Sequence, residues 1–459
     1  MGEERKKGNR QPEPAYSSNR RSEYGSFVVL LVTRRSMLDP SSALGRFAGR
    51  LTGYALLAIA YLDAHAPPRF ASYALSTASS RGDGPLQHLD GGATQRFATS
   101  AASLLSDDEA AASQWPFLHD TDRRKMEVFG GHILRSHGRF YWYGEAAKVL
   151  SAPGFPVGVN EGWTNEGIAC YVSDDMTRWR SAGIVFRNTS VSLPSSEPGP
   201  YVLERPKVLY NRATSKFVMW FHLDSFSYTY RYAGVATSDS PLGPFAFLHA
   251  LRPGGLHSFD LQLHRSPTSD AAFLVRDTNG HEETVVSALN PSYTDVTRRV
   301  SAIPGPCEAP ALFEDEDGVT YCLCSYATWY LPNPLQIWRH RGRLDAAGGW
   351  EELGTVPGGE APLHALLAPL LRPLDSAATT YNSQPSSVVP WVDEAGRFSP
   401  ILLGDSWNAR GPGGVGNASQ TFLRLARTGD RSRPWRLLPG RSWMREQMEQ
   451  RANLSRWLY

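Results

Sequence analysis

A strand–turn–strand unit recurs along this chain, and most copies begin with an acidic or amide residue. Four copies begin at Glu204, Asp260, Glu308 and Gln384. In the first of these, ERPKVLY is followed by the turn NRATS and then by KFVMWFH. An earlier copy, GGHILRSHGRFYWYGE, carries Gly130 and Gly131 in place of the polar residue. Equivalent positions in repeated β-units tend to face one shared place, so the sequence predicts polar side chains that converge on one site.

The pattern between these units indicates the fold class. Short strand signals, separated by turns rich in Gly, Asp, Asn and Pro, run from about residue 114 to about residue 425. Long amphipathic helical patterns are scarce. Units that recur every several tens of residues favour a propeller over a sandwich or barrel. We therefore expect an all-β, five-bladed β-propeller over residues 111–430, followed by a tail over 431–459.

Composition limits the function classes. The chain has 459 residues, of which 41% are hydrophobic, so it can bury a large core. A formal net charge of +2 gives no case for a nucleic-acid partner. Four cysteines without CxxC spacing argue against a disulfide scaffold and against a zinc site. Cys322 and Cys324 should share one face of a strand. Buried free thiols, or one disulfide in a secreted protein, both remain open.

Residues 1–110 have a different texture from the rest. The first 25 residues or so are polar and are expected to be disordered, and residues 67–110 are typical of a linker. Between them, Arg34 and Arg35, the apolar run 51–62 and Ala64-His65-Ala66 resemble a signal peptide or signal anchor, with an amphipathic helix as the alternative. We expect a secreted monomer, with membrane anchoring only through residues 51–62. Sequons at Asn188, Asn417 and Asn453 fit that expectation.

Nine stretches form a more specific pattern: GGHIL…FYWYGE, GIACYVSDDMTRW, ERPKVLYNRATSKFVMWFHLD, AGVATSDSPLGPF, SFDLQLH, EAPALF, TWYLPN, SQPSSVV and LLGDSW. Their order and spacing resemble glycoside hydrolase family 43, and within it the galactan 1,3-β-galactosidase (exo-β-1,3-galactanase) branch. The resemblance covers roughly residues 115–430. It implies a five-bladed propeller and hydrolysis with inversion of the anomeric centre. The implied substrate is an oligo- or polysaccharide of the galactan or arabinogalactan type.

Inverting hydrolysis needs an acid for the leaving oxygen and a base-activated water on the opposite face of the sugar. The resemblance implies that Glu308 is the general acid and that Asp260 tunes and orients it. Glu204 is then a third acidic residue at the sugar-binding centre, and Gln384 takes the place of a carboxylate base. A neutral amide is a very poor base. Either Glu204 accepts the proton, or Gln384 acts through an imidic tautomer.

The resemblance also implies a set of sugar contacts: Glu145, Tyr228, Thr328, Tyr330, Asp405 and Trp407. The ring of Tyr330 or Trp407 would stack on the apolar face of galactose. We expect His222 and Asp224 to form a buried, hydrogen-bonded pair under the site. We predict no metal and no cofactor.

Four positions depart from the family pattern. Phe259 and Cys307 stand where the family usually has Arg, Phe129 stands where His is usual, and Tyr330 where Trp is usual. The acidic set itself is intact. The departures keep two alternatives open: another family 43 activity, on an arabinofuranoside or a xyloside, and a non-catalytic propeller that binds glycan or protein.

Overall fold

The computed structural model describes residues 118–149, 163–176, 178–267, 269–278, 280–327, 333–345, 348–356, 380–392, 396–406 and 419–438. The expected signal segment, the linker and the sequons at Asn417 and Asn453 lie outside the described residues. Within the described residues, no helix has the length and apolar character needed to cross a membrane.

In the part of the chain that the structure describes, twenty strands form five antiparallel sheets of four consecutive strands each. Blade 1 contains β1 (Phe129–Ser136), β2 (Arg139–Val149), β3 (Trp163–Ser173) and β4 (Arg180–Arg187), and blade 2 contains β5 (Tyr201–Asn211), β6 (Lys216–Ser225), β7 (Tyr232–Ser238) and β8 (Ala246–Leu251). Blade 3 contains β9 (Leu261–Arg265), β10 (Ala272–Thr278), β11 (Glu283–Leu289) and β12 (Val296–Pro304). Blade 4 contains β13 (Glu308–Glu314), β14 (Thr320–Ser325), β15 (Leu335–His340) and β16 (Trp350–Val356), and blade 5 contains β17 (Gln384–Val389), β18 (Ile401–Ser406), β19 (Ser419–Arg427) and β20 (Trp435–Leu438).

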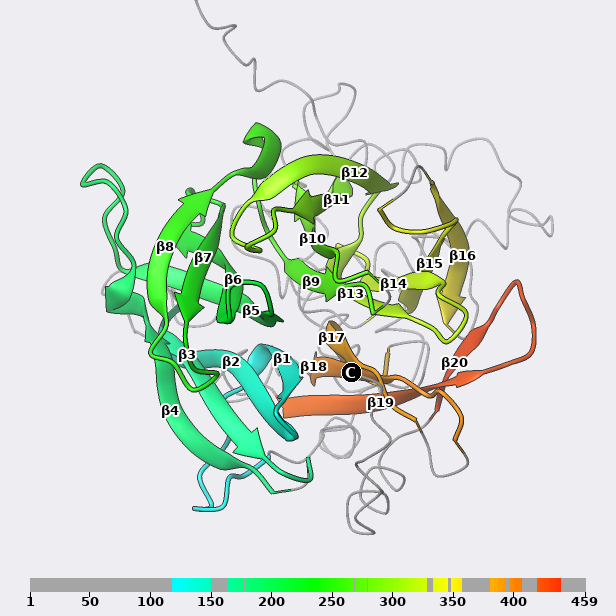
Figure 1. Ribbon diagram of the computed structural model, residues 1–459, viewed down its shortest axis with the longest axis horizontal. Coiled ribbons are helices and arrows are strands. Elements are labelled where there is room, and N and C mark those ends of the chain that lie inside the picture. Colours follow the sequence, from blue (N-terminus) through cyan, green and yellow to red (C-terminus); the bar gives the residue numbers. More distant parts are fainter. Residues whose placement is uncertain are drawn as a thin grey trace, which may run out of the picture. The chain divides into compact units, whose positions relative to one another are not determined.

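The blades close into a ring through their first strands (Figure 1). β1 contacts β5, β5 contacts β9, β9 contacts β13, β13 contacts β17, and β17 returns to β1. The repeat units predicted from the sequence are these five inner strands with their partners, and the five-bladed propeller is confirmed. The expected domain boundary at residue 430 falls between β19 and β20. The polar turn that precedes Trp435 resembles a domain end in the sequence, but it only connects two strands of blade 5.

Alternation along the strands builds the seams between blades. Successive side chains point to opposite faces of a sheet, and strands such as β10 and β14 are buried on both faces along their whole length. In β6, Trp220 packs toward blade 3 while its neighbour Phe221 packs toward blade 1. In β13, Leu312 packs toward blade 3 and Phe313 toward blade 5. The aromatic runs in the sequence therefore fill two seams at once, which explains their near-continuous apolar character.

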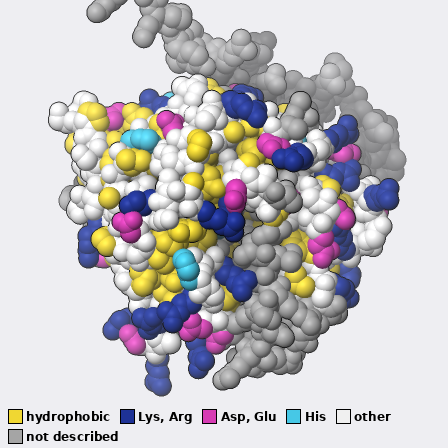
Figure 2. All heavy atoms as spheres, viewed as in Figure 1, with side chains coloured by type: hydrophobic (Ala, Val, Ile, Leu, Met, Phe, Trp, Pro, Cys, Tyr) yellow, Lys and Arg dark blue, Asp and Glu magenta, His cyan; other side chains and the backbone are white. Residues whose placement is uncertain are grey.

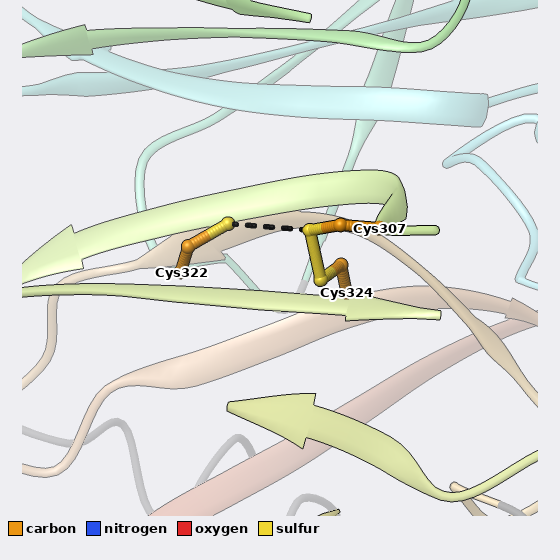
Figure 3. A group of neighbouring side chains, drawn as sticks. All are labelled: Cys307, Cys322 and Cys324. Atoms are coloured by element: carbon orange, nitrogen blue, oxygen red, sulfur yellow. Dashed lines mark hydrogen bonds between the residues drawn. A yellow bond between two sulfur atoms is a disulfide. The ribbon is translucent and has the colours of Figure 1, made fainter. Parts of the chain in front are cut away.

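The cysteines settle into one disulfide and two thiols. Cys307, just before β13, bonds to Cys324 on β14, and Cys170 and Cys322 are buried and free. Cys322 and Cys324 share a face as predicted, and Cys322 points toward the disulfide, with its Sγ 4.0 Å from that of Cys307 (Figure 3). The disulfide therefore ties the start of β13 to the neighbouring strand.

One sequon is inconsistent with glycosylation in the folded protein. Asn188 is buried, and its side-chain amide donates to the carbonyl of Tyr201. A glycan on that nitrogen would have to break this contact and displace its surroundings, so the sequon at Asn188 does not support secretion.

Candidate active site

Irregular pairing at the inner strands determines where their polar side chains point. The pairing of β5 with β6 shifts between Glu204 and Lys207, and that of β13 with β14 shifts between Glu308 and Ala311. The residues that follow the two glutamates, Arg205 and Ala309, both have φ of 54°. Left-handed backbone is costly for residues other than glycine, and such bulges re-aim side chains beside functional sites. The same feature, a left-handed residue at a shift in strand pairing, therefore sets the direction of both glutamate side chains.

Arg205 joins four of the five blades, although the sequence analysis did not select it. Its guanidinium Nη2 lies 3.1 Å from Asp260 Oδ2 and donates to Gln384 Oε1 at 2.6 Å. Its backbone N–H donates to Glu145 Oε1 at 2.9 Å. Burial opposes the charge of Arg205, but nearby carboxylates outweigh it and raise the pKa of the guanidinium. Phe259 stands where the family usually has an Arg beside Asp260, and Arg205 supplies a positive charge to Asp260 from blade 2.

The first blade carries glycine where the other blades carry a polar residue, and the structure gives the reason. Gly130 has φ of 57°, and a Cβ there would lie 2.3 Å from Glu145 Oε1. The Gly130 N–H donates to Asp405 Oδ2 at 3.0 Å, and its carbonyl accepts from Lys207 Nζ at 2.7 Å. The glycine backbone therefore takes the place of a side chain in the site, because the carboxylate of Glu145 occupies that space.

Glu204 is held by hydrogen bonds to both of its carboxylate oxygens. Tyr228 OH donates to Oε1 at 2.6 Å, and His222 Nδ1 bonds to Oε2 at 2.9 Å. His222 Nε2 bonds in turn to Asp224 Oδ2 at 3.0 Å, so the expected buried His222–Asp224 pair is confirmed. Burial acts to lower the pKa of His222, but the hydrogen bonds with Asp224 and Glu204 outweigh it and raise the pKa to about 10. His222 is therefore an imidazolium at neutral pH.

Glu308 has the opposite environment. Burial, helped by the charges of Asp260 and Asp277, raises the pKa of Glu308 to about 8, against the lowering effect of His281 and Arg205. Among the described residues, Glu308 Oε2 has no hydrogen-bond partner. The carboxyl group of Glu308 therefore keeps its proton at neutral pH and can donate it, as a general acid must.

Two further carboxyl groups in the site are also perturbed. Burial, followed by the charge of Glu204, raises the pKa of Glu145 to about 8. Burial raises the pKa of Asp405 to about 6, against the charge of Arg205. A raised pKa alone thus does not single out Glu308. Glu145 and Asp405 differ from it because each accepts a backbone hydrogen bond, from Arg205 and Gly130 respectively.

The predicted residues that the structure describes converge as the repeat pattern suggested. Arg205 contacts Glu145, Asp260 and Gln384 directly. It also interacts through its charge with Glu308 and Asp405. Glu204 precedes Arg205 in the chain, and Tyr228 contacts Glu204. Thr328, Tyr330 and Trp407 lie outside the described residues.

The sequence analysis missed Arg205, Lys207 and His281. The first two lie in the ERPKV stretch and could have been found from their position beside Glu204. His281 lies in a turn, outside any repeated stretch, so no pattern marks it.

One face of the propeller, over the part of the chain that the structure describes, has no dominant charge (Figure 2). Figure 2 shows acidic and basic side chains interspersed with apolar ones over the described part of this face. A partner with the charge density of a nucleic acid would call for a basic stripe. The face instead suits a ligand without a large net charge.

Comparisons with known proteins point to one group. The chain matches no protein-family model and no curated protein sequence. Among solved structures, it is similar to a family GH43 β-1,3-galactosidase, with 26% identity, TM-score 0.56, and 70% of this chain and 61% of that chain covered. It is also similar to the exo-β-1,3-galactanase of Phanerochaete chrysosporium with galactose, with 25% identity, TM-score 0.56 and coverage of 71% and 66%.

A third structure, a family GH43 β-1,3-galactosidase with galactodeoxynojirimycin, has 25% identity and TM-score 0.55, with 71% of this chain and 97% of that chain covered. The described site thus belongs to a fold shared with galactose-binding proteins. The chain spans less than two thirds of the first two structures, at 61% and 66% of their lengths.

Proposed function

We propose, from the membership of this chain in glycoside hydrolase family 43, that it is an inverting exo-β-1,3-galactosidase acting on galactan or arabinogalactan-type chains. Three observations support the proposal. The motifs resemble the galactanase branch in order and spacing, and solved structures of that branch have the same fold. The polar residues that carry the resemblance also converge on one site.

The environment of Glu308 is the observation that carries the proposal. A buried carboxyl group with a pKa of about 8 retains its proton at neutral pH and can donate it to a leaving group. Asp260 adds a negative charge nearby, which raises the pKa of Glu308, and Arg205 fixes Asp260 by an ion pair at 3.1 Å. A protonated acid is one of the two parts that an inverting glycosidase requires, and Asp260 tunes this acid.

In the proposed reaction, Glu308 donates its proton to the glycosidic oxygen as the bond from that oxygen to the anomeric carbon breaks. A water attacks the same carbon from the opposite face of the ring. Positive charge that develops on the sugar is stabilised by the surrounding carboxylates. The products are galactose of inverted configuration and a shortened chain with a free hydroxyl.

We assign Glu204 as the group that accepts the proton from this water, with Gln384 as the group that orients it. The Arg205 guanidinium donates to Gln384 Oε1 at 2.6 Å. A positive charge this close makes addition of a proton to an already weakly basic amide still less favourable. Glu204 is a carboxylic acid side chain, and its two oxygens are held by Tyr228 and His222.

Product analysis on β-1,3-galactan tests the proposed function. Proton NMR during hydrolysis should show α-galactose as the first sugar released, followed by mutarotation. Glu308→Gln is the matched control, and it should release galactose about 10³-fold more slowly with an unchanged melting temperature. Release of β-galactose contradicts the proposed stereochemistry. Turnover of only arabinofuranosides or xylosides supports a different family 43 activity, and binding without turnover supports a non-catalytic propeller.

We further propose that the protein is exported from the cytosol. The Cys307–Cys324 disulfide supports this, since structural disulfides persist mainly in oxidising compartments. Detection of the protein in the reduced cytosol, with Cys307 and Cys324 both alkylated after denaturation without a reducing agent, would contradict it.

A further inference from the structure

The turn that joins β10 to β11 braces the segment that carries Glu308. Thr284, on β11, is buried, and its Oγ1 donates to the carbonyl of Cys307 at 2.9 Å. Asp277, near the end of β10, donates its backbone N–H to the carbonyl of Asp260 at 3.0 Å. The strand ends on either side of this turn thus contact both the residue before Glu308 and the residue that tunes it.

His281 lies in this turn and is held from two sides. Its Nδ1 bonds to Asp277 Oδ2 at 2.8 Å, and the Asp277 side chain is fully buried. The ring of Phe259 lies against the imidazole, with 5.0 Å between the ring centroids. Burial acts to lower the pKa of His281, but the charge and hydrogen bond of Asp277 outweigh it and raise the pKa to about 10. His281 is therefore a fixed imidazolium at neutral pH.

We propose that His281 is a positioning residue for proton donation: its imidazolium supplies the positive charge that stabilises the carboxylate of Glu308 after the proton has left. The inference rests on the proposed function, in which Glu308 is the acid. It assigns a role to a residue outside the repeated motifs. It also gives Phe259, whose ring lies against His281, a part in the site.

The charges around the two groups determine the sign of the effect. His281 is influenced by the negative charges of Asp277, Glu308 and Asp260. Glu308 is influenced by His281 and Arg205, which lower its pKa, and by Asp260 and Asp277, which raise it. Removing the imidazolium should therefore raise the pKa of Glu308 further above 8. The acid would then be protonated over a wider pH range but would release its proton less readily.

His257 provides a matched control on the same aromatic ring. Its ring centroid lies 6.4 Å from that of Phe259, and its Nδ1 lies 3.4 Å from Arg231 Nη1. Burial, together with the charges of Arg231 and Arg252, lowers the pKa of His257. His257 is thus neutral at neutral pH. Its replacement perturbs the packing on Phe259 without removing a positive charge.

The test compares His281→Gln, His281→Lys and His257→Gln through the pH dependence of kcat/KM on β-1,3-linked galactobiose. The alkaline limb should move up by roughly one pH unit in His281→Gln, stay in place in His257→Gln and return toward wild type in His281→Lys. At neutral pH, His281→Gln should lower kcat by about tenfold on galactobiose and less on 4-nitrophenyl galactoside, whose leaving group needs little protonation.

Two results would overturn the inference: an unmoved alkaline limb in a folded His281→Gln protein, or the same shift in His257→Gln. If His281→Gln does not fold, Asp277→Asn/His281→Gln removes the buried pair together. The limb should still move up in that variant, but by less, because His281 affects Glu308 more than Asp277 does. Isotope-edited infrared titration of Glu308 in the same variants separates the two proposals. It detects the shift even if the wild-type protein hydrolyses no galactan.

Discussion

The first strands of blade 2 and blade 4 have the same local backbone conformation, but their glutamates lie in different environments. Glu204 and Glu308 each lie on an inner strand, and each is followed by a residue with φ of 54° and a shift in strand pairing. The Glu204 side chain keeps 21% of its surface exposed and accepts hydrogen bonds from Tyr228 and His222. Glu308 is buried, and its Oε2 has no partner among the described residues.

The comparison shows that repetition supplies the position of a carboxyl group, while its neighbours decide its chemistry. The His222 imidazolium and the Tyr228 hydroxyl both donate hydrogen bonds to Glu204, an arrangement that binds an anion. Burial and two carboxylates keep the proton on Glu308. Two glutamates on equivalent strands can then serve as acid and as proton acceptor at the same pH, which is the arrangement that two-carboxylate hydrolysis requires.

The largest effects are expected when each glutamate is replaced in turn by neutral glutamine. Glu308→Gln and Glu204→Gln should both lower kcat by about 10³-fold. Their stabilities should differ: Glu204→Gln should cost about 2 kcal/mol, since it loses hydrogen bonds to a charged group, whereas Glu308→Gln should cost little. Urea unfolding at neutral pH measures this. Equal losses of stability would mean that the two environments do not differ as described.

Replacing Arg205 should affect both glutamates, because Arg205 follows Glu204 in the chain and its charge acts on Glu308. Arg205→Met leaves Asp260 and Asp405 without their buried counter-charge, and should lower the free energy of unfolding by about 3 kcal/mol and abolish activity. Arg205→Lys keeps the charge but cannot contact Asp260, Gln384 and the Pro385 carbonyl together, and it should fall between Arg205→Met and wild type. Stability of Arg205→Met equal to that of wild type would show that the ion pair does not hold the site.

Breaking the disulfide perturbs the start of blade 4 directly. The Cys307–Cys324 bond closes a loop with a sequence separation of 17 residues, so Cys324→Ser should lower the free energy of unfolding by about 3 kcal/mol. Cys170→Ser, at a buried free thiol in blade 1, is the control and should cost less. If Cys322 replaces Cys324 as the partner of Cys307, a non-reducing peptide map of Cys324→Ser will show a Cys307–Cys322 bond.

The smallest expected effect is the pH dependence of stability that comes from His222 in blade 2. The folded-state pKa of His222, about 10, lies above its ordinary value of 6.5, so its protonation stabilises the folded protein fully below pH 6.5. This contribution is lost as the pH rises toward 10. Urea unfolding of wild type and His222→Gln across this range should show the difference in stability shrinking with increasing pH. A difference that stays constant would contradict the assignment of an imidazolium.

The sequence predicted the parts of this molecule that depend on repetition. Strand alternation and evenly spaced units indicated five blades, and the polar residues at the strand starts converge because the inner strands meet. It did not predict Arg205 as the shared counter-ion, because the link from blade 2 to Asp260 and Gln384 exists only once the ring has closed. His281 lies in a turn, where no periodicity applies. The boundary at residue 430 was misplaced for a similar reason, since a polar turn inside a blade resembles the end of a domain.

The most direct test of the account is the proton affinity of the Glu308 carboxyl group. Isotope-edited infrared spectra of the wild-type protein, minus those of Glu308→Gln, isolate this group from Glu145, whose pKa is raised to a similar value. The difference should show a protonated carboxyl band that disappears near pH 8. A band that disappears near pH 4 to 5, in the ordinary range of glutamic acid, would contradict the assignment of Glu308 as the acid.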